Sequence, residues 1–453
     1  MRRRAPRVLM IAHAFPPAGG SGANRALAFA RYLPAFGWRP LVLTPDLAWA
    51  AHRDDGLLRL VPSDLPLIRT PSFEPRPAPS PGAGGHPIDR PPPVARRDGQ
   101  RRVWRPLMRH VGHLKRFPDA HLGWLPYAVA AGRQQDVDLL YSSSGPFTSH
   151  LVAGILARVL GKPWVAELRD GWYRWNRAIF PDYPVWRDAI ERRLEAASLG
   201  SADRVVLVTE RMAQAFRRQY AGRLAPERFA VIANGFDPAL LAPAGEAATK
   251  DDAAAASESA CFEIVHTGAL YYGRSIASFL AAAAALAERD RDFGAAVRLT
   301  LVGTLDPAAQ AELAASPLGG RICSTGQLEH AAAVATLRRA GLLLLIANTT
   351  PGAAATVPGK LFEYLAVGRP ILAVAPAASS TADVLAQTGG AYLADGSDTG
   401  SLERALASAF AAFRARQPLR PDPQAVARYD RRRLTGELAQ LFDQVQTGAA
   451  RRL

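Results

Sequence analysis

The stretch of sequence that decides the fold lies near the start of the chain and reads VLMIAHAFPPAGGSGANRALAFARYL, residues Val8 to Leu33. Its apolar beginning is typical of a buried strand, and two prolines end that run. Gly19, Gly20 and Gly22 then form a glycine cluster, after which the spacing of the apolar residues becomes helical. A strand, a glycine turn and a helix in this order predict the start of a βαβ unit. Backbone N–H groups at such a turn can hold an anion.

The glycine cluster departs from both common phosphate-binding fingerprints. The dinucleotide fingerprint G-x-G-x-x-G begins directly after a strand, whereas here residues His13 to Ala18 intervene. Gly20 and Gly22 supply its first two glycines, but Arg25 stands at the third position. The pattern G-x-x-x-x-G-K-[ST] occurs nowhere in the chain, which excludes a P-loop. Taken alone, the cluster fits either an anion site or a flexible turn before a helix.

Short apolar runs bounded by turn residues alternate with segments of helical spacing along the whole chain. In the first half, strands are expected at residues 8–12, 41–44, 139–142, 164–167, 205–209 and 229–232, and helices at 24–36, 149–160, 186–199 and 211–220. In the second half, strands are expected at 262–266, 297–302, 321–324, 342–347, 371–375 and 391–393, and helices at 276–289, 307–316, 330–340, 361–367, 380–388 and 401–416. This alternation predicts an α/β protein with a doubly wound parallel sheet in each half.

Changes in composition mark the boundaries between these halves. We expect a first domain at residues 1–239 and a second at 261–422, joined at 240–260 by a linker rich in Ala, Ser and acidic residues. Residues 71–102 are dense in Pro and Gly, which predicts a disordered insertion in the first domain. The last segment, 423–453, is expected to form a helix that crosses back to the first domain.

The chain of 453 residues carries a formal net charge of +15, mostly from arginine, since the lysines are limited to Lys115, Lys162, Lys250 and Lys360. A basic excess favours anionic partners such as phosphates, acidic lipid surfaces or nucleic acid, although a basic solvated surface explains it equally well. Because no recognition motif accompanies the charge, no nucleic-acid partner is expected. Two cysteines are too few for a disulfide framework and indicate a reducing compartment.

Two segments bear on contact with a membrane. Residues 1–15 resemble a signal peptide but have a short apolar run and no cleavage site, so we expect a basic tail and a buried strand there. No run approaches the ~18 apolar residues that a membrane-spanning helix needs, so any membrane contact would be peripheral. Residues 103–134 mix Arg, Lys, Trp and Leu at helical spacing. That pattern fits either an amphipathic element on a membrane surface or a helix packed on the first domain.

Two motifs in the second half carry residues suited to a nucleotide. HTGALYYGRS, residues His266–Ser275, combines a strand end, a glycine turn and Arg274, whose planar guanidinium can bind phosphate oxygens in pairs. VPGKLFEYLAVGRPIL, residues Val357–Leu372, places Lys360 and Glu363 on the first turn of an expected helix. Lys360 can meet phosphate oxygens, and Glu363 can accept hydrogen bonds from ribose hydroxyls. The alternative is a solvent-exposed arginine and a surface ion pair at helical spacing.

Five motifs, in this order along the chain, resemble those of one large family. They are FPPAGGSGANRALAFARYLPAFGWRPLVLTP, YSSSGPFTSHLVAGILARVLGKPWVAELRDGW, IANGFD, HTGALYYGRS and VPGKLFEYLAVGRPILAV. They are similar to motifs of the retaining, nucleotide-sugar-dependent glycosyltransferases of the GT-B fold, usually called family 4 or group 1. The resemblance spans nearly the whole chain. It implies two Rossmann-like, doubly wound domains that face each other across a cleft, with the donor nucleotide held mainly by the second.

The resemblance also implies roles for particular residues of the second domain. Arg274 would clamp the diphosphate of the donor, and Lys360 would be a second cation on the phosphate side. Glu363 matches the glutamate that contacts the ribose. Gly268 and Leu361 would lie beside the nucleotide.

In the first domain, the resemblance implies that Gly19 and Gly20 approach the donor from the opposite wall of the cleft. Arg169 and Asp170 would line the sugar pocket, and His150 would approach the reacting sugar. His150 and Asp170, together with the two cations of the second domain, are the expected catalytic residues.

The sequence departs from the family pattern at two positions. The family often has two glutamates eight positions apart, but Ala355 stands eight positions before Glu363, which leaves the contacts to the donor sugar open. The lysine that often follows the clamping arginine is also absent, because SIASFL follows Arg274. Lys360 could supply that charge instead.

The expected reaction is transfer of a sugar from a nucleoside diphosphate sugar to an acceptor hydroxyl, with retained anomeric configuration. No D-x-D motif stands at an expected strand end, so we expect a metal-independent reaction with no cofactor beyond the donor substrate. The acceptor would be a saccharide or a lipid-linked saccharide, used for cell-surface polysaccharide or glycolipid synthesis in the cytoplasm or at the inner face of the plasma membrane. A sugar-nucleotide 2-epimerase and a non-catalytic scaffold of the same fold remain alternatives.

Overall fold

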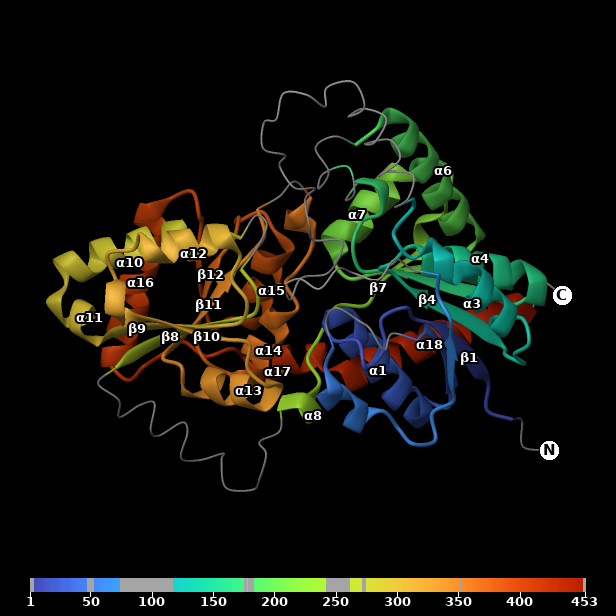
Figure 1. The fold of residues 1–453 in the computed structure, drawn as a ribbon, viewed down its shortest axis with the longest axis horizontal. Helices are drawn as coiled ribbons and strands as arrows, with labels where there is room; N and C mark the ends of the chain where they lie inside the picture. The colour runs from blue at the N-terminus through green and yellow to red at the C-terminus, as the bar shows by residue number, and fades with distance from the viewer. Residues whose placement is uncertain are drawn as a thin grey trace. The chain divides into compact units, whose positions relative to one another are not determined.

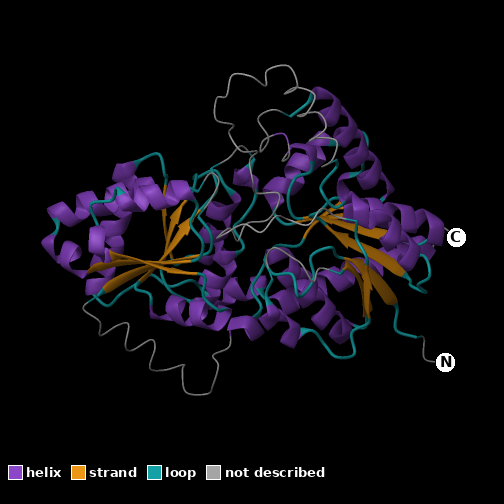
Figure 2. Ribbon diagram, in the orientation of Figure 1, coloured by secondary structure: helices purple, strands orange, loops and turns teal. Residues whose placement is uncertain are grey.

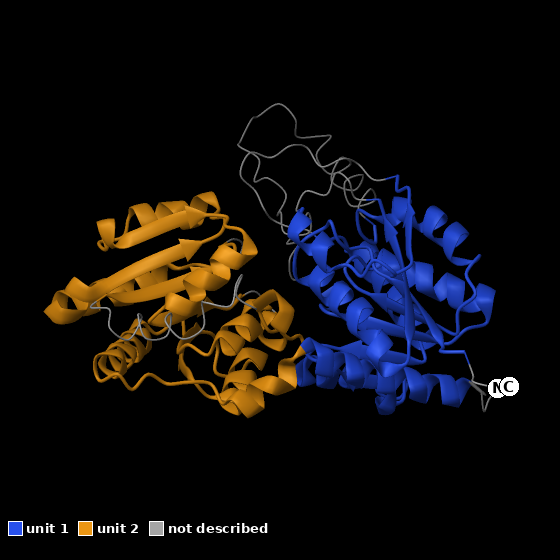
Figure 3. Ribbon diagram, turned by 90° about the horizontal axis from the view of Figure 1, so that it is seen from below, with its two compact units in different colours: residues 1–79, 86–233, 431–453 blue, residues 80–85, 234–430 orange. Residues whose placement is uncertain are grey.

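The computed structural model describes residues 4–46, 53–73, 117–174, 177, 183–241, 261–270, 274–349 and 352–450. These residues form two compact units, which Figure 3 colours separately. Unit 1 combines the described residues up to 233 with those of the C-terminal segment from 431 onward, and the described part of unit 2 lies within residues 234–430.

Unit 1 is built on a seven-stranded parallel sheet with the strand order β3-β2-β1-β4-β5-β6-β7. Its strands are β1 (Arg7–Ile11), β2 (Arg39–Pro45), β3 (Leu67–Thr70), β4 (Leu139–Ser143), β5 (Trp164–Leu168), β6 (Arg204–Leu207) and β7 (Phe229–Val231). Every residue of β4 and β5 is buried, because helices lie on both sides of the sheet (Figure 2). The strand order reverses between β1 and β4. In open sheets of this kind, ligands bind at the carboxyl ends of the strands beside such a reversal.

The C-terminal helix is part of the core of unit 1. The helices of this unit are α1 (Ser21–Tyr32), η1 (Leu33–Phe36), η2 (Asp55–Leu60), η4 (Leu122–Trp124), α3 (Leu125–Gly132), α4 (Thr148–Leu160), α6 (Val185–Ser201), α7 (Glu210–Gln219), η5 (Pro226–Arg228) and α18 (Arg431–Ala450). Helix α18 runs alongside α1 (Figure 1). The indole N–H of Trp38 donates to Asp443 Oδ1 at 2.9 Å, and the Trp38 ring contacts Phe442.

Unit 2 contains a six-stranded parallel sheet with the order β10-β9-β8-β11-β12-β13. Its strands are β8 (Phe262–Thr267), β9 (Val297–Val302), β10 (Ile322–Gly326), β11 (Leu342–Ile346), β12 (Ile371–Val374) and β13 (Ala391–Ala394). Its helices are α8 (Pro238–Leu241), α10 (Ala277–Arg289), α11 (Arg291–Ala296), α12 (Pro307–Ala314), η6 (Gly319–Arg321), α13 (His330–Arg339), η7 (Ala353–Ala355), α14 (Lys360–Val367), α15 (Ser380–Thr388), α16 (Thr399–Arg414), α17 (Pro423–Val426) and η8 (Ala427–Tyr429). The rings of Phe262, Phe293 and Phe410 contact one another in its core. The strand order reverses here between β8 and β11.

The structure confirms the predicted fold class, because each half of the chain forms a parallel sheet covered by helices. All twelve predicted strands are present, with ends that differ by a few residues. Among the strands and α-helices, the sequence pattern missed β3, α8 and α11. The missed strand β3 is an edge strand with one buried residue, so it lacks the continuous apolar run that marks a central strand.

The units divide at positions that differ from the expected domain boundaries. The chain leaves unit 1 after Ala233 rather than after residue 239, so helix α8 belongs to unit 2. The single terminal helix expected from residue 423 is broken, because α17 stays in unit 2 and α18 lies in unit 1. At the break, the backbone N–H of Phe236 donates to the carbonyl of Tyr429 at 3.0 Å. The insertion expected at 71–102 and the linker expected at 240–260 lie almost entirely outside the described residues.

The described half of the basic segment 103–134 packs on the sheet of unit 1. Trp124 is fully buried, and its indole N–H donates to the hydroxyl of Thr70 at 2.8 Å. The rest of that segment, up to residue 116, lies outside the described residues. For residues 117–134 the structure therefore supports the packed-helix alternative.

Candidate functional site

A cluster of positively charged and polar groups lies at the carboxyl end of β8 in unit 2. Lys360 is the first residue of α14, and its Nζ lies 3.2 Å from Nε2 of His266 near the end of β8. Gly268 follows that strand, with a φ of +99°, and a Cβ built there would come within 2.8 Å of Lys360 Nζ. A side chain at Gly268 would therefore be strained and would displace the lysine. Together with Arg274, these residues are called the cation site below.

The two ring nitrogens of His266 have different partners. Nδ1 lies 2.9 Å from the backbone carbonyl of Leu344 on β11, and a carbonyl oxygen can only accept. Nδ1 therefore carries the proton, and Nε2 is left to accept a hydrogen bond from Lys360. Burial and the neighbouring Lys360 cation hold the pKa of His266 well below its ordinary value, so the ring is neutral at physiological pH.

The charge environment of Lys360 is unusual for a lysine. Burial and the nearby Arg274 guanidinium lower the pKa of its ammonium to about 7, while Glu363 acts in the opposite direction. Lys360 makes no ion pair within 4.0 Å among the residues that the structure describes. An anion bound here would supply the missing counter-charge.

The other residues predicted for the nucleotide have different surroundings. Arg274 and Glu363 are half-buried, and Gly268 is exposed, so ligand atoms can reach all three. The side chain of Leu361 is fully buried in the core, so only its backbone could meet the nucleotide, and that contact stays a prediction. Its backbone N–H also donates to the carbonyl of Pro358 at 3.0 Å. An apolar side chain on the inner face of an amphipathic helix packs inward, which the helical spacing alone could have indicated.

Tyr364 joins α14 to β8 through a contact that no sequence motif indicated. Its buried hydroxyl accepts a hydrogen bond from the backbone N–H of Thr267 at 2.8 Å and lies 3.2 Å from the Thr267 hydroxyl. This contact fixes the first turn of α14 against the strand end and so places Lys360. The sequence carries only a weak signal for this role of Tyr364, because a tyrosine within an apolar run is usually predicted to be an ordinary core residue.

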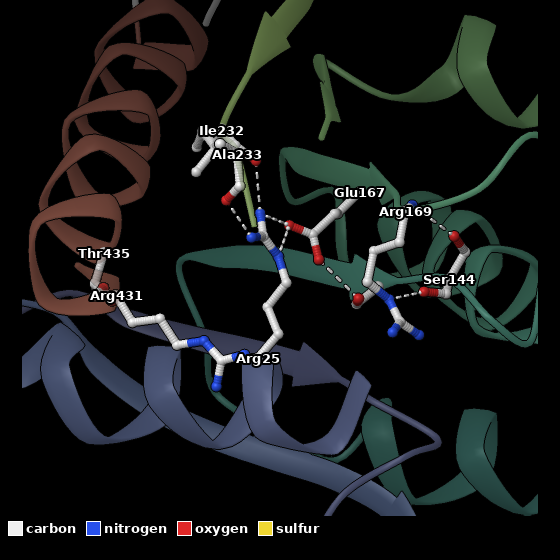
Figure 4. Close-up of polar contacts among 9 residues, drawn as sticks. Arg25, Ser144, Glu167, Arg169, Ile232, Ala233, Arg431 and Thr435 are labelled. Carbon is white, nitrogen blue, oxygen red and sulfur yellow. Dashed lines mark hydrogen bonds and ion pairs between the residues drawn. The ribbon is translucent and has the colours of Figure 1, made fainter. Parts of the chain in front are cut away.

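In unit 1, Arg25 and Glu167 form a buried ion pair (Figure 4). Nε and Nη2 of Arg25 lie 2.9 Å and 2.7 Å from the same oxygen of Glu167, and Ser143 donates to the other oxygen at 2.7 Å. The guanidinium also donates to the carbonyls of Ile232 and Ala233, at 2.9 Å and 2.5 Å. Burial alone would raise the pKa of Glu167, but the Arg25 guanidinium holds that pKa below its usual range. Arg25, which replaces the third glycine of the fingerprint, thus clamps the end of unit 1 before the chain passes to unit 2.

Arg169 lies against the glycine cluster of unit 1. A Cβ at Gly22 would come within 2.4 Å of Arg169 Nη1, so the guanidinium covers the start of α1. Arg169 is held by the carbonyl of Ser144 through Nε (Figure 4). Gly20 is the N-cap of α1, with a φ of 93°, and no side chain caps that helix end. Burial raises the pKa of the half-buried Asp170, an effect that Arg169 partly offsets.

His150 differs from its expected position beside the reacting sugar. The side chain on α4 is fully buried, and its Nδ1 lies 2.8 Å from Ser142 Oγ, which also accepts the indole N–H of Trp164 at 2.8 Å. Its ring lies 6.2 Å from that of Trp172. Burial lowers the pKa of His150 to about 3, so the ring is neutral. A helix that is apolar on its inner face carries this histidine into the core, and its approach to the reacting sugar stays a prediction.

We expect the ring of His150 to stay uncharged between about pH 8 and about pH 5, because its buried site favours the neutral form. An NMR titration of the histidine ring protons, assigned with His150→Gln, measures this directly. A midpoint near the ordinary histidine value of about 6.5 would show instead that solvent reaches the ring.

Within the described ranges, no cluster of three or more His, Cys, Asp or Glu side chains is arranged to hold a metal ion.

Residues 19–240 match the family described as Glycosyltransferase Family 4, and residues 261–411 match the family described as Glycosyl transferases group 1. Together with the two Rossmann-like units, these matches show that the chain belongs to the group 1 glycosyltransferases of the GT-B fold. A comparison with curated proteins gives no match.

Solved structures with the same fold include a sugar-phosphate synthase and complexes with nucleotides and sugars. Sucrose-phosphate synthase from Thermosynechococcus elongatus is 17% identical, with a TM-score of 0.62 over 98% of this chain and 100% of that chain. HepE from Anabaena, solved in complex with UDP and glucose, is 15% identical, with a TM-score of 0.60 over 97% of this chain and 100% of that chain. The catalytic domain of Starch Synthase IV from Arabidopsis thaliana, bound to ADP and acarbose, is 12% identical, with a TM-score of 0.59 over 98% of this chain and 99% of that chain. At these identities the likeness establishes the fold.

Proposed function

We propose that the protein transfers a sugar from a nucleoside diphosphate sugar to a hydroxyl of a saccharide or lipid-linked acceptor, with retained anomeric configuration. The observation that carries this proposal is the cation site of unit 2, where Lys360 and Arg274 stand beside an exposed glycine at the carboxyl end of β8. A diphosphate carries the negative charge that would balance these two cations. Ligands of solved structures with this fold, UDP with glucose in HepE and ADP in Starch Synthase IV, support the choice.

The chemistry of the leaving group explains the need for two cations. As the bond between the sugar and the diphosphate breaks, negative charge grows on the phosphate oxygens, and fixed positive groups stabilise it. Arg274 and Lys360 would supply that stabilisation without a metal ion, and Glu363 would bind the ribose. The contacts of Gly19, Gly20, Arg169 and Asp170 with the donor stay predictions from the family pattern.

Retention would arise by attack of the acceptor on the same face that the diphosphate leaves. In this reaction the acceptor oxygen forms a bond to the anomeric carbon while the bond to the phosphate oxygen breaks. The departing phosphate takes the proton of the acceptor hydroxyl. Most of the rate would then come from orientation and charge stabilisation, since the fully buried His150 is not placed to act as a base.

Incubation with a panel of UDP, GDP, ADP and TDP sugars and an acceptor extract tests the proposed transfer. We expect nucleotide release with one donor, dependent on the acceptor, and a product with the anomeric configuration of the donor. Release without any acceptor, or an epimerised donor, would point to the 2-epimerase alternative. Binding without turnover would favour a scaffold, for which Ala355 in place of the first glutamate is the sequence argument.

A membrane-linked acceptor would suit the basic character of the chain, and we place the reaction in the cytoplasm at the inner face of the plasma membrane. In the part of the chain that the structure describes, no helix is long and apolar enough to cross a membrane. A peripheral contact would use the basic residues before 117, which lie outside the described residues. Flotation with anionic vesicles should carry the protein upward at low salt, and absence of binding would remove the membrane element.

A further inference from the structure

The carboxyl end of β8 holds Lys360 in one position. The backbone carbonyl of Leu344 orients the His266 ring, and Nε2 of that ring lies 3.2 Å from Lys360 Nζ. On the other side, the absent side chain of Gly268 leaves the space that Nζ occupies. The helix that carries Lys360 is fixed to β8 through Tyr364. The amine therefore has a defined place before any ligand arrives.

The groups that act on the charge of Lys360 come from three elements. His266 on β8 is neutral and accepts a hydrogen bond, Arg274 after β8 repels the ammonium, and Glu363 on α14 attracts it. Burial adds to the repulsion, so the pKa of Lys360 falls to about 7. A diphosphate brings at least two negative charges to the same place. The protonated form would then be favoured strongly in the complex.

We propose that His266 is a positioning residue that presents Lys360 to the donor as an amine, and that binding of the donor's diphosphate transfers one proton from solvent to that amine. This inference rests on the proposed function, because it assigns the diphosphate of a nucleotide to the cation site. The amine nitrogen gains the proton, the buffer loses it, and His266 keeps its own proton on Nδ1. The resulting ammonium donates one hydrogen bond to His266 and can direct the others to phosphate oxygens.

Calorimetry with UDP, GDP and ADP at about pH 8, in buffers of different ionisation enthalpy, measures the proton directly. At this pH the terminal phosphate is already ionised, since its pKa is about 6, so the proton must go to the protein. We expect uptake of close to one proton per bound nucleotide, and an affinity that falls roughly twentyfold between about pH 7.5 and about pH 9. Lys360→Met should bind more weakly, without uptake and without that pH dependence. Tight binding by the wild-type protein without uptake would overturn the proposal.

Two conservative variants separate positioning from mere folding. In His266→Asn, the amide N–H can replace Nδ1 toward Leu344, but the acceptor for Lys360 is lost. In His266→Gln, the longer side chain can place an amide oxygen near Lys360. We expect about tenfold weaker nucleotide binding in the first variant and a smaller loss in the second, at similar thermal stability.

Each remaining outcome has a separate meaning. Equal affinities in His266→Asn, His266→Gln and the wild-type protein, or equal losses in both variants, would reject the positioning role. If the wild-type protein binds none of the three nucleotides and no donor sugar, the proposed function fails, and the inference fails with it. Nucleotide binding without proton uptake rejects the inference alone.

Discussion

Replacement of Arg25 by methionine is expected to lower the free energy of unfolding of unit 1 by about 3–5 kcal/mol, because it leaves the buried Glu167 carboxylate without its positively charged partner. The carbonyls of Ile232 and Ala233 would also lose their donors. Urea unfolding followed by tryptophan fluorescence reports on this unit specifically, since all eight tryptophans lie before residue 187. The deficit should be larger at about pH 8 than at about pH 5, because burial raises the pKa of the unpaired Glu167 carboxyl and lower pH then neutralises it.

Two control variants test whether the pair, and not the loss of a long side chain, causes the effect. The double variant Arg25→Met with Glu167→Met should recover most of the lost stability, because no unpaired charge remains. Arg31→Met, on the same helix but half-exposed, should change the free energy of unfolding by less than about 1 kcal/mol. A loss in Arg31→Met as large as that in Arg25→Met would contradict the assigned role of the buried pair.

Replacement of Arg274 by alanine is expected to lower kcat/KM for sugar transfer by about a hundred- to a thousandfold, the usual cost of removing one charge-stabilising donor from a leaving-group site. The half-buried position of Arg274 in the cation site, close enough to Lys360 to lower the pKa of that lysine, is the reason for this expectation. The affinity for free nucleotide should fall as well, and the pKa of Lys360 should rise, because Arg274 helps to depress it. Steady-state kinetics with the identified donor and calorimetry with the free nucleotide measure these effects.

Arg298→Ala is a matched control for that experiment. Arg298 lies on β9 of the same unit, is exposed, and donates to the carbonyls of Ala295 and Val297 rather than facing the cation site. We expect its kcat/KM within about threefold of the wild-type value. Unchanged activity in Arg274→Ala would remove the leaving-group role and with it the main support for the proposed function.

Arg274 and Lys360 of the cation site could be predicted from the sequence, because each lies in a short motif that marks the end of a strand or the start of a helix. The motif HTGALYYGRS marks a strand end and a turn, and VPGKLFEYL marks the start of a helix. The carboxyl ends of parallel strands meet at one edge of a sheet, so such residues gather there whatever the remaining packing. The role of His266 could not be predicted, since its partners Leu344 and Lys360 lie 78 and 94 positions away.

In unit 1 the sequence was less informative. In the sequence, Arg25 was only a departure from the dinucleotide-binding fingerprint. In the structure it forms an ion pair with Glu167, which lies 142 positions further along the chain. The sequence pattern predicted His150 near the substrate, whereas in the structure its side chain on α4 is buried in the core. Whether a polar residue on a helix faces ligand or core depends on what packs against that helix, and no local pattern contains this information.

By itself the sequence determined the α/β class and twelve of the thirteen strands, because short apolar runs such as LLLLI at residues 342–346, set between segments of helical spacing, are typical of central strands covered by helices on both faces. It also determined that Lys360 and Arg274 belong to one edge of the second sheet. Only the tertiary structure decided that Arg25 is a clamp, that His266 orients Lys360, and that the C-terminal helix joins unit 1. Each of these depends on strand order and on contacts between residues far apart in the chain, which periodicity does not encode.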